Sequence, residues 1–284
     1  MIEKINYSMT TTPRLIIIGD SFSVEPMEST DSTMTWPRQV AADLGLELMP
    51  LSQHGVSQDW CFQQLRAGFH SVNQITAEDR IVICLTHPNR YWFVQDEPNL
   101  SNMHIIGMDH YVSKEKNKAI QGFMRHIQRP QLDTLNMIMR LGWLTSYITR
   151  LGLPNPLIMR CFDIDISEAK QHKEISWATG TLFDIQNQEF AETDTQSDQY
   201  FRGIDCRYNH LTLSNHGILA KKIVDFFQHD ITVDLTEGFI QGLILNDSWK
   251  DTDFCAREFN QYRITDMHAR PAWTMSKIMK RPSW

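Results

Sequence analysis

The stretch RLIIIGDSFS, residues 14–23, decides how the rest of the chain is interpreted. Four large aliphatic residues, 15–18, are followed directly by Gly19-Asp20-Ser21. An unbroken apolar run is typical of a parallel strand covered on both faces, because a half-exposed strand would alternate apolar and polar residues. Gly19 permits a sharp turn that puts Asp20 and Ser21 at the carboxyl end of the strand, where open α/β sheets bind ligands. Ser21 is therefore a candidate nucleophile, although the same tripeptide also suits an ordinary turn.

Further apolar runs alternate with amphipathic segments along the chain. We expect strands at 46–51, 81–85 and 156–162, and helices at 36–45, 58–69 and 209–227. Ser57 is a candidate cap for the second of these helices, and Ser214 or Asn215 for the last. This alternation predicts an α/β fold, a three-layer sandwich with a parallel sheet of about five strands wound in βαβ units.

The sequence also predicts how the chain is divided. Residues 1–12 are interpreted as a flexible tail and residues 13–228 as the main domain, with a helical insertion at about 91–152. Within that domain, residues 165–203 are polar and weakly patterned, so we expect a long surface loop with short helices. Residues 229–284 form a C-terminal extension, in which a helix is expected at 235–245. Its basic end is interpreted as a tail that wraps its own domain or a second copy of the chain.

Charge and composition limit the classes of function. The formal net charge of −7 gives no support to nucleic-acid binding, which usually needs a basic surface. No run approaches the roughly 18 apolar residues of a membrane span, and the N-terminus lacks the pattern of a secretory signal. We therefore expect a cytoplasmic protein with no membrane partner. The five cysteines are widely spaced and form no CxxC pair, which favours buried thiols over disulfides or a zinc site.

Chemically capable residues fall in four clusters, each after an expected strand or just before a helix. They are Asp20-Ser21, Gly55 with Ser57, the turn from Thr86 to Arg90 that contains His87 and Asn89, and His210. Taken alone, His210 is also compatible with a capping or surface histidine. His87 is compatible with a hydrogen bond to substrate or with a metal ligand, but no HxH or HxxxH spacing supports a metal site.

The order of these clusters resembles the SGNH hydrolases, also called the GDSL esterase/lipase family. The resemblance covers about residues 13–228 and rests on Gly19-Asp20-Ser21-Phe22-Ser23, on Gly55, and on His210 before the last helix. It implies a flavodoxin-like hydrolase fold. Two departures are evident. The family's third block, Gly-x-Asn-Asp, is replaced by Thr86-His87-Pro88-Asn89-Arg90, and Arg207 stands three residues before His210 where the family has an aspartate.

The resemblance implies a serine esterase that needs no cofactor. Ser21 would be the nucleophile, His210 the base and Asp205 the acid, while Gly55 and Asn89 would bind the oxyanion, with Asp20 and His87 nearby. We expect a substrate with a small acyl or acetyl group on a carbohydrate or another polar carrier. The alternative is a catalytically impaired member that acts as a binding or structural module. A homo-oligomer formed through the C-terminal extension is compatible with either interpretation.

Overall fold

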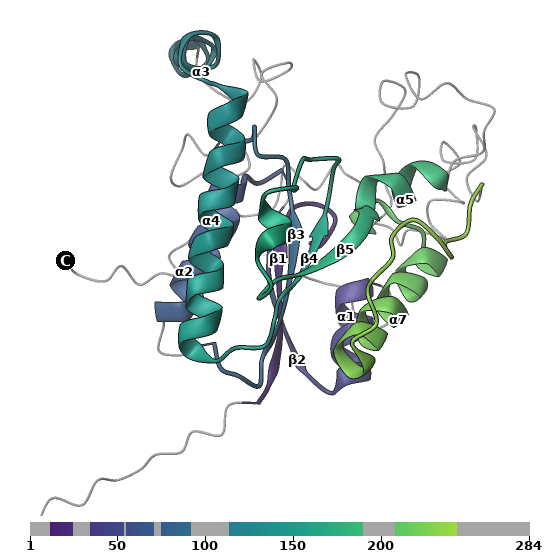
Figure 1. Ribbon diagram of the computed structural model, residues 1–284. Helices are drawn as coiled ribbons and strands as arrows, with labels where there is room; N and C mark the ends of the chain where they lie inside the picture. The colour runs from purple at the N-terminus through teal and green to yellow at the C-terminus, as the bar shows by residue number, and fades with distance from the viewer. Residues whose placement is uncertain are drawn as a thin grey trace, which may run out of the picture.

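The computed structural model describes residues 12–24, 35–53, 55–70, 75–91, 114–189 and 208–242. Within these ranges five strands form one all-parallel sheet, in the order β2-β1-β3-β4-β5 (Figure 1). The strands are β1 (Arg14–Gly19), β2 (Glu47–Ser52), β3 (Arg80–Leu85), β4 (Leu157–Arg160) and β5 (Ser176–Thr181). The predicted α/β fold with a parallel sheet of about five strands is therefore confirmed.

In the sheet, β1 lies between β2 and β3, the two strands that follow it in the chain. The chain passes from β1 to β2 on one side and then returns to β3 on the other side of β1. Order 2-1-3-4-5 is common among doubly wound sheets, and the gap between the ends of strands 1 and 3 is where such sheets bind ligands. All six residues of β1 are buried, as its unbroken apolar run predicted. Ser21 thus lies at the position where this topology favours a site.

Helices cover both faces of the sheet. Figure 1 shows α1 (Trp36–Leu44), α5 (Leu182–Gln188) and α7 (Leu213–His229) on one face, with α2 (Gln58–His70) and α4 (Pro130–Leu151) on the other. The helix α3 (Lys114–His126) precedes α4 and lies at its far end, away from the sheet. Alternate strand residues pack into two separate cores, for example Ile17 toward α1 and α7 and Ile18 toward α2 and α4. No helix within the described ranges is both long and apolar enough to cross a membrane.

Two expectations about the second half of the chain are wrong in part. The segment 165–203 contains the expected short helices, among them α5, but also the strand β5, which was not expected. Residues 235–242 form no helix. Instead the chain around Val233 and Leu235 runs along the edge of β5. The Thr179 amide donates to the Val233 carbonyl over 2.9 Å, and the Leu235 amide donates to the Thr179 carbonyl over 3.0 Å. An otherwise exposed sheet edge is thereby covered, and both flanking side chains are buried.

Helix ends follow the predictions in part. Gly45 ends α1 in the left-handed conformation, and the Ser57 hydroxyl accepts the Trp60 amide at the start of α2 over 3.2 Å. The cap of α7 is Thr212, whose side chain accepts from the Asn215 amide, and not Ser214 or Asn215 as expected. Thr212 has the extended backbone conformation of a cap residue, with φ of −72° and ψ of 159°.

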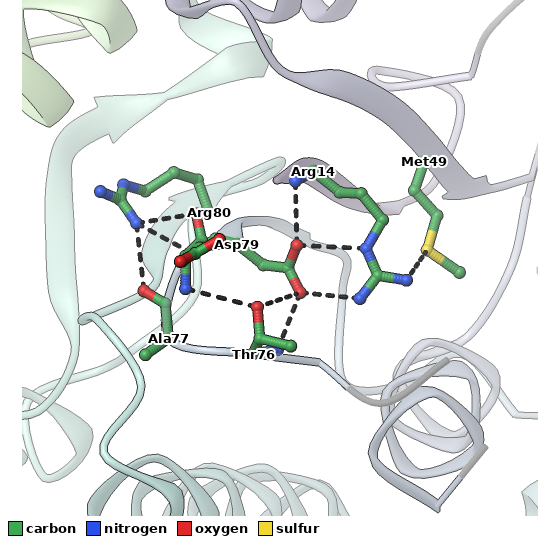
Figure 2. A network of polar contacts seen from close by, with 7 residues as sticks. Arg14, Met49, Thr76, Ala77, Asp79 and Arg80 are labelled. Carbon is green, nitrogen blue, oxygen red and sulfur yellow. Dashed lines mark hydrogen bonds and ion pairs between the residues drawn. The ribbon is translucent and has the colours of Figure 1, made fainter. Parts of the chain in front are cut away.

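A buried ion pair ties the amino ends of β1 and β3 together at the edge opposite Ser21. The Arg14 guanidinium contacts the Asp79 carboxylate at 2.7 Å (Figure 2). The same carboxylate accepts the backbone amides of Arg14 at 2.9 Å and Thr76 at 2.8 Å. Burial by itself would raise the pKa of Asp79, but these hydrogen bonds outweigh burial and hold its pKa below the ordinary value.

Candidate active site

The structure brings Ser21 and His210 into contact, although 189 positions separate them in sequence. Ser21 is the second residue after β1, and its Oγ lies 2.8 Å from Nε2 of His210. Both side chains are partly exposed, so solvent and a ligand can reach them. A hydroxyl within hydrogen-bond distance of an imidazole is the arrangement that activates a serine for nucleophilic attack.

The turn at residues 208–212 carries His210 to this position. Asn209 and His210 both have positive φ angles, of 48° and 60°, and are followed by buried Leu211 and the cap Thr212. Positive φ is uncommon outside glycine, and consecutive cases are a mark of a tightly constrained turn. The Phe22 ring packs against the imidazole with the ring centres 4.8 Å apart. Phe22, the residue after Ser21, thus fixes the orientation of the His210 ring.

Glu189 holds the turn at residues 208–212 in place, and it is not among the residues predicted from the sequence. Its carboxylate is completely buried at the end of α5 and accepts the Thr212 amide at 2.9 Å and the Thr212 hydroxyl at 2.9 Å. It also accepts the Asn215 side-chain amide at 2.6 Å. An anion at a helix N-terminus is stabilised by the unpaired amides there. In the sequence Glu189 is only one glutamate within a polar segment. The local pattern does not distinguish such a residue from an exposed surface glutamate.

Asp20, next to the nucleophile, is buried and makes three contacts. Oδ1 accepts the Phe22 amide at 3.2 Å and the Cys161 thiol at 3.2 Å, and Oδ2 receives Nη1 of Arg90 at 3.0 Å. Burial raises the pKa of Cys161, helped by Cys84 and by the charge of Asp20, so this thiol is a hydrogen-bond donor and not a nucleophile. Asp20 therefore holds the turn around Ser21 in shape.

The ends of β2 and β3 flank the nucleophile on either side. The Gln53 amide donates to the Gly19 carbonyl at 3.1 Å, which ties the loop bearing Gly55 to the turn after β1. Gly55 has φ of 67°, and a Cβ there would meet no atom within 4 Å, so conformation, not space, favours glycine. A role for Gly55 in binding an oxyanion stays a prediction.

Asn89 and His87 lie in the turn after β3. The Asn89 backbone amide donates to Nδ1 of His87 at 3.2 Å, so His87 shapes this turn. The side-chain oxygen of Asn89 is buried and has no hydrogen-bond partner in the part of the chain described. A buried polar atom without a partner is rare and marks a site where a ligand or water would bind. The predicted roles of both residues remain untested.

The predicted acid, Asp205, and its neighbour Arg207 lie outside the described residues. Asn209, two residues after Arg207, is 4% exposed. Its side-chain nitrogen and oxygen both lack hydrogen-bond partners within the described ranges.

His216, six residues after His210, is part of the scaffold. It is fully buried in α7, and its Nδ1 accepts the backbone amide of Trp36 at 3.2 Å. The Trp36 indole in turn donates to the Phe22 carbonyl at 3.0 Å. This sequence of contacts joins the helix after His210 to the turn after β1, so the two halves of the site share one rigid support.

Comparison of the sequence with protein-family models, with curated proteins and with solved structures finds no match. Among the residues that the structure describes, no group of three or more histidine, cysteine, aspartate or glutamate side chains is arranged to hold a metal ion. The chemistry of the site therefore has to be argued from its geometry.

Proposed function

We propose that this protein is a serine esterase of the SGNH type, with Ser21 as nucleophile and His210 as base. The observation that carries the proposal is the 2.8 Å contact between Ser21 Oγ and His210 Nε2 at the carboxyl edge of a doubly wound sheet. Three further features support it: both residues are partly exposed, the nucleophile follows a buried strand, and the base stands on a constrained turn.

In this mechanism Ser21 attacks the ester carbonyl while His210 Nε2 accepts the hydroxyl proton. The imidazolium then donates that proton to the departing alcohol, which leaves an acyl group on Ser21. In the second half, His210 removes a proton from water, the resulting hydroxide attacks the acyl carbonyl, and Ser21 recovers its proton. The base must begin neutral with its proton on Nδ1, because Nε2 can accept only when it carries no proton.

The oxyanion formed on the carbonyl needs hydrogen-bond donors. The proposal assigns this role to the backbone amides of Ser21 and Gly55 and to the side chain of Asn89. In Asn89 the donor would be the side-chain Nδ2, since the buried Oδ1 can only accept a hydrogen bond. Removal of one such donor typically lowers kcat by about 100- to 1,000-fold, so Asn89→Ala has a large expected effect.

Asp205 is proposed as the third member of the triad, the acceptor for Nδ1–H of His210. If Asp205 does not fill this role, a main-chain carbonyl would accept the bond in its place. Asp205→Asn should lower acylation by several powers of ten if the carboxylate holds Nδ1–H of His210. Near-normal turnover in Asp205→Asn would leave a Ser21–His210 dyad as the mechanism.

The proposed substrate is a small acyl or acetyl ester on a carbohydrate or another polar carrier. Tyr91, an aromatic residue that follows the turn after β3, is already engaged, because its hydroxyl donates to the Asp133 carboxylate. Its contact with the Phe123 ring, 5.1 Å between centres, holds it on the insertion helices. The substrate preference consequently depends on residues other than Tyr91.

Covalent labelling tests the proposal most directly. A fluorophosphonate should label the folded protein at Ser21, and Ser21→Ala should abolish both labelling and hydrolysis of a short-chain aryl ester. Ser23→Ala is the matched control, because Ser23 lies in the same turn and contacts the Asp20 carbonyl and Ser52, not a histidine. Labelling that survives Ser21→Ala contradicts the mechanism. An unlabelled but folded protein that still binds an ester favours the alternative, a non-catalytic binding module.

A further inference from the structure

Arg90 stands beside the nucleophile because of the way β1 and β3 pair. Ile18 is aligned with Ile83, so the turn after β3 runs alongside the turn that carries Ser21. From that turn Arg90 extends Nη1 to within 3.0 Å of Oδ2 of Asp20, the residue that directly precedes Ser21. The guanidinium is therefore at the switch point of the sheet, where ligands of this topology bind.

The two side chains of the Asp20–Arg90 ion pair are not equally exposed to solvent. The Asp20 side chain is 0% exposed, whereas 16% of the Arg90 side chain reaches solvent. The Asp20 charge is further turned inward, since Oδ1 accepts the Phe22 amide and the Cys161 thiol. A ligand arriving at Ser21 consequently meets the cation of the pair, not the anion.

The guanidinium is also held rigidly and linked to the base. It lies over the Phe162 ring at 5.0 Å from the ring centre. Phe162 packs edge-on against Phe22 with 5.8 Å between centres, and Phe22 packs against His210. Cation–π contact and ion pair fix the side chain before any ligand binds, which lowers the entropy cost of binding.

Arg90 retains unused donors. Nη1 bonds to Asp20, but within the described ranges Nε and Nη2 have no acceptor. If Arg90 served only to neutralise Asp20, we would expect the guanidinium to be fully buried with those donors satisfied. Two adjacent N–H groups on one edge of a guanidinium instead match the two oxygens of a carboxylate or phosphate.

We propose that Arg90 forms an anion subsite beside Ser21, so that the preferred ester carries a carboxylate or phosphate group near the scissile bond. This inference rests on the proposed esterase function and narrows its substrate class. A protein with a net charge of −7 repels anions at long range, so a fixed cation inside the site is needed to select them.

The test compares matched pairs of esters at a pH where the carboxylate is ionised. One pair places the charge on the alcohol side, para-acetoxybenzoate against para-acetoxybenzamide. The other places it on the acyl side, phenyl hemiglutarate against phenyl pentanoate. The measured quantity is the ratio of kcat/KM for the anionic and the neutral member. In at least one pair we expect wild type to favour the anion by about 10- to 100-fold, the range for a charge-assisted hydrogen-bonded contact. Para-acetoxyphenyl phosphate then distinguishes a carboxylate from a phosphate preference.

Two variants attribute the preference to Arg90. Asp20→Asn combined with Arg90→Gln removes both charges together, so no unpaired buried carboxylate is left, and the ratio should fall to about 1 whatever the absolute rate. Arg90→Lys keeps the charge and gives a second variant if the first does not fold; it should retain part of the preference. Lys173→Gln is a control for loss of a positive charge elsewhere on the protein: it removes one at an exposed residue before β5 and should keep the wild-type ratio.

Failure of this inference is distinguishable from failure of the esterase function. Turnover of neutral esters without anion preference in either pair, or a preference unchanged by the double variant, overturns the subsite and leaves the esterase intact. Absence of turnover of every ester overturns the proposed function. In that case calorimetric binding of para-acetoxybenzoate to Ser21→Ala, with and without the double variant, still decides whether Arg90 binds anions.

Discussion

Replacing Asp79 with asparagine tests whether the buried ion pair at the amino edge of the sheet holds β1 and β3 together. The Asp79 side chain is 1% exposed and the Arg14 side chain 10% exposed, so the pair is largely shielded from water. Asparagine has nearly the same volume and creates no cavity. Its NH2 group, however, must replace one of two oxygens that both face donors, as Figure 2 shows for Arg14 and Thr76.

The expected loss is large because the arginine charge stays behind. Removal of one partner from a buried ion pair typically costs about 3–5 kcal/mol, since the remaining charge is buried without compensation. A typical domain has a free energy of unfolding of about 5–15 kcal/mol, so Asp79→Asn should remove a substantial part of the total. Ser21 lies at the opposite edge, so the folded variant should still react with a fluorophosphonate.

The pH dependence provides a second measurement with a defined sign. The pKa of Asp79 is lower in the folded protein than its ordinary value, because hydrogen bonds to Arg14 and Thr76 outweigh burial. A depressed carboxyl pKa contributes stability above the unfolded pKa of about 3.9, and this contribution is lost as the pH falls through the folded value. The difference between wild type and Asp79→Asn should therefore be constant from about pH 6 to 8 and shrink below about pH 4.

Urea unfolding followed by tryptophan fluorescence measures both effects. Asp225→Asn is the control, since Asp225 pairs with Lys221 on the surface of α7 and should cost no more than about 1 kcal/mol. A loss at pH 7 no larger than that of the control, or a difference that persists unchanged at pH 3, would refute the reasoning.

Two further substitutions probe the support of the site. Gly19→Ala would place a methyl carbon 2.5 Å from Cβ and 2.9 Å from the carbonyl oxygen of Cys84. This overpacking should lower the free energy of unfolding by about 1–3 kcal/mol or more and reduce fluorophosphonate labelling of Ser21. A urea midpoint equal to that of wild type would contradict this prediction. Glu189→Gln removes the negative charge that accepts the Thr212 amide and hydroxyl, and should lower the free energy of unfolding by about 1.5–3 kcal/mol. At temperatures where the variant is folded, fluorophosphonate labelling should also be slower. An unchanged labelling rate would show that Glu189 does not position His210.

The central strands were predictable because burial on both faces leaves a local signature. Residues 15–18 and 81–85 are unbroken apolar runs, and only a strand covered by helices on both faces tolerates them. The helices between them carry turn and cap signals, such as Gly45, that act over a few residues. The chain order of Ser21 and His210 was likewise visible, and the structure brings the two side chains together.

The edge of the sheet was not predictable in the same way. Residues 176–181 carry no apolar run, and they form a strand because β4 lies on one side and residues 233–235 on the other. The segment at 235–242 has helical composition, but its backbone groups are used by β5 and by Asn215, whose side chain bonds to Ile240. Pairing with a distant partner overrides local propensity when it satisfies backbone groups and buries apolar side chains together.

The sequence by itself therefore determined the fold class, the strand that carries Ser21, and the place of His210 close to the start of the last helix, because each of these depends on residues close together in the chain. Tertiary structure alone decided which charges are buried. Glu189 and Asp79 look like ordinary surface carboxylates in sequence, and nothing local shows that Asp20 is buried. Each of the three is buried because a donor from a distant segment meets it. The physical reason is that a buried charge is tolerated only where its partners converge, and those partners are assembled by the fold rather than by sequence neighbours.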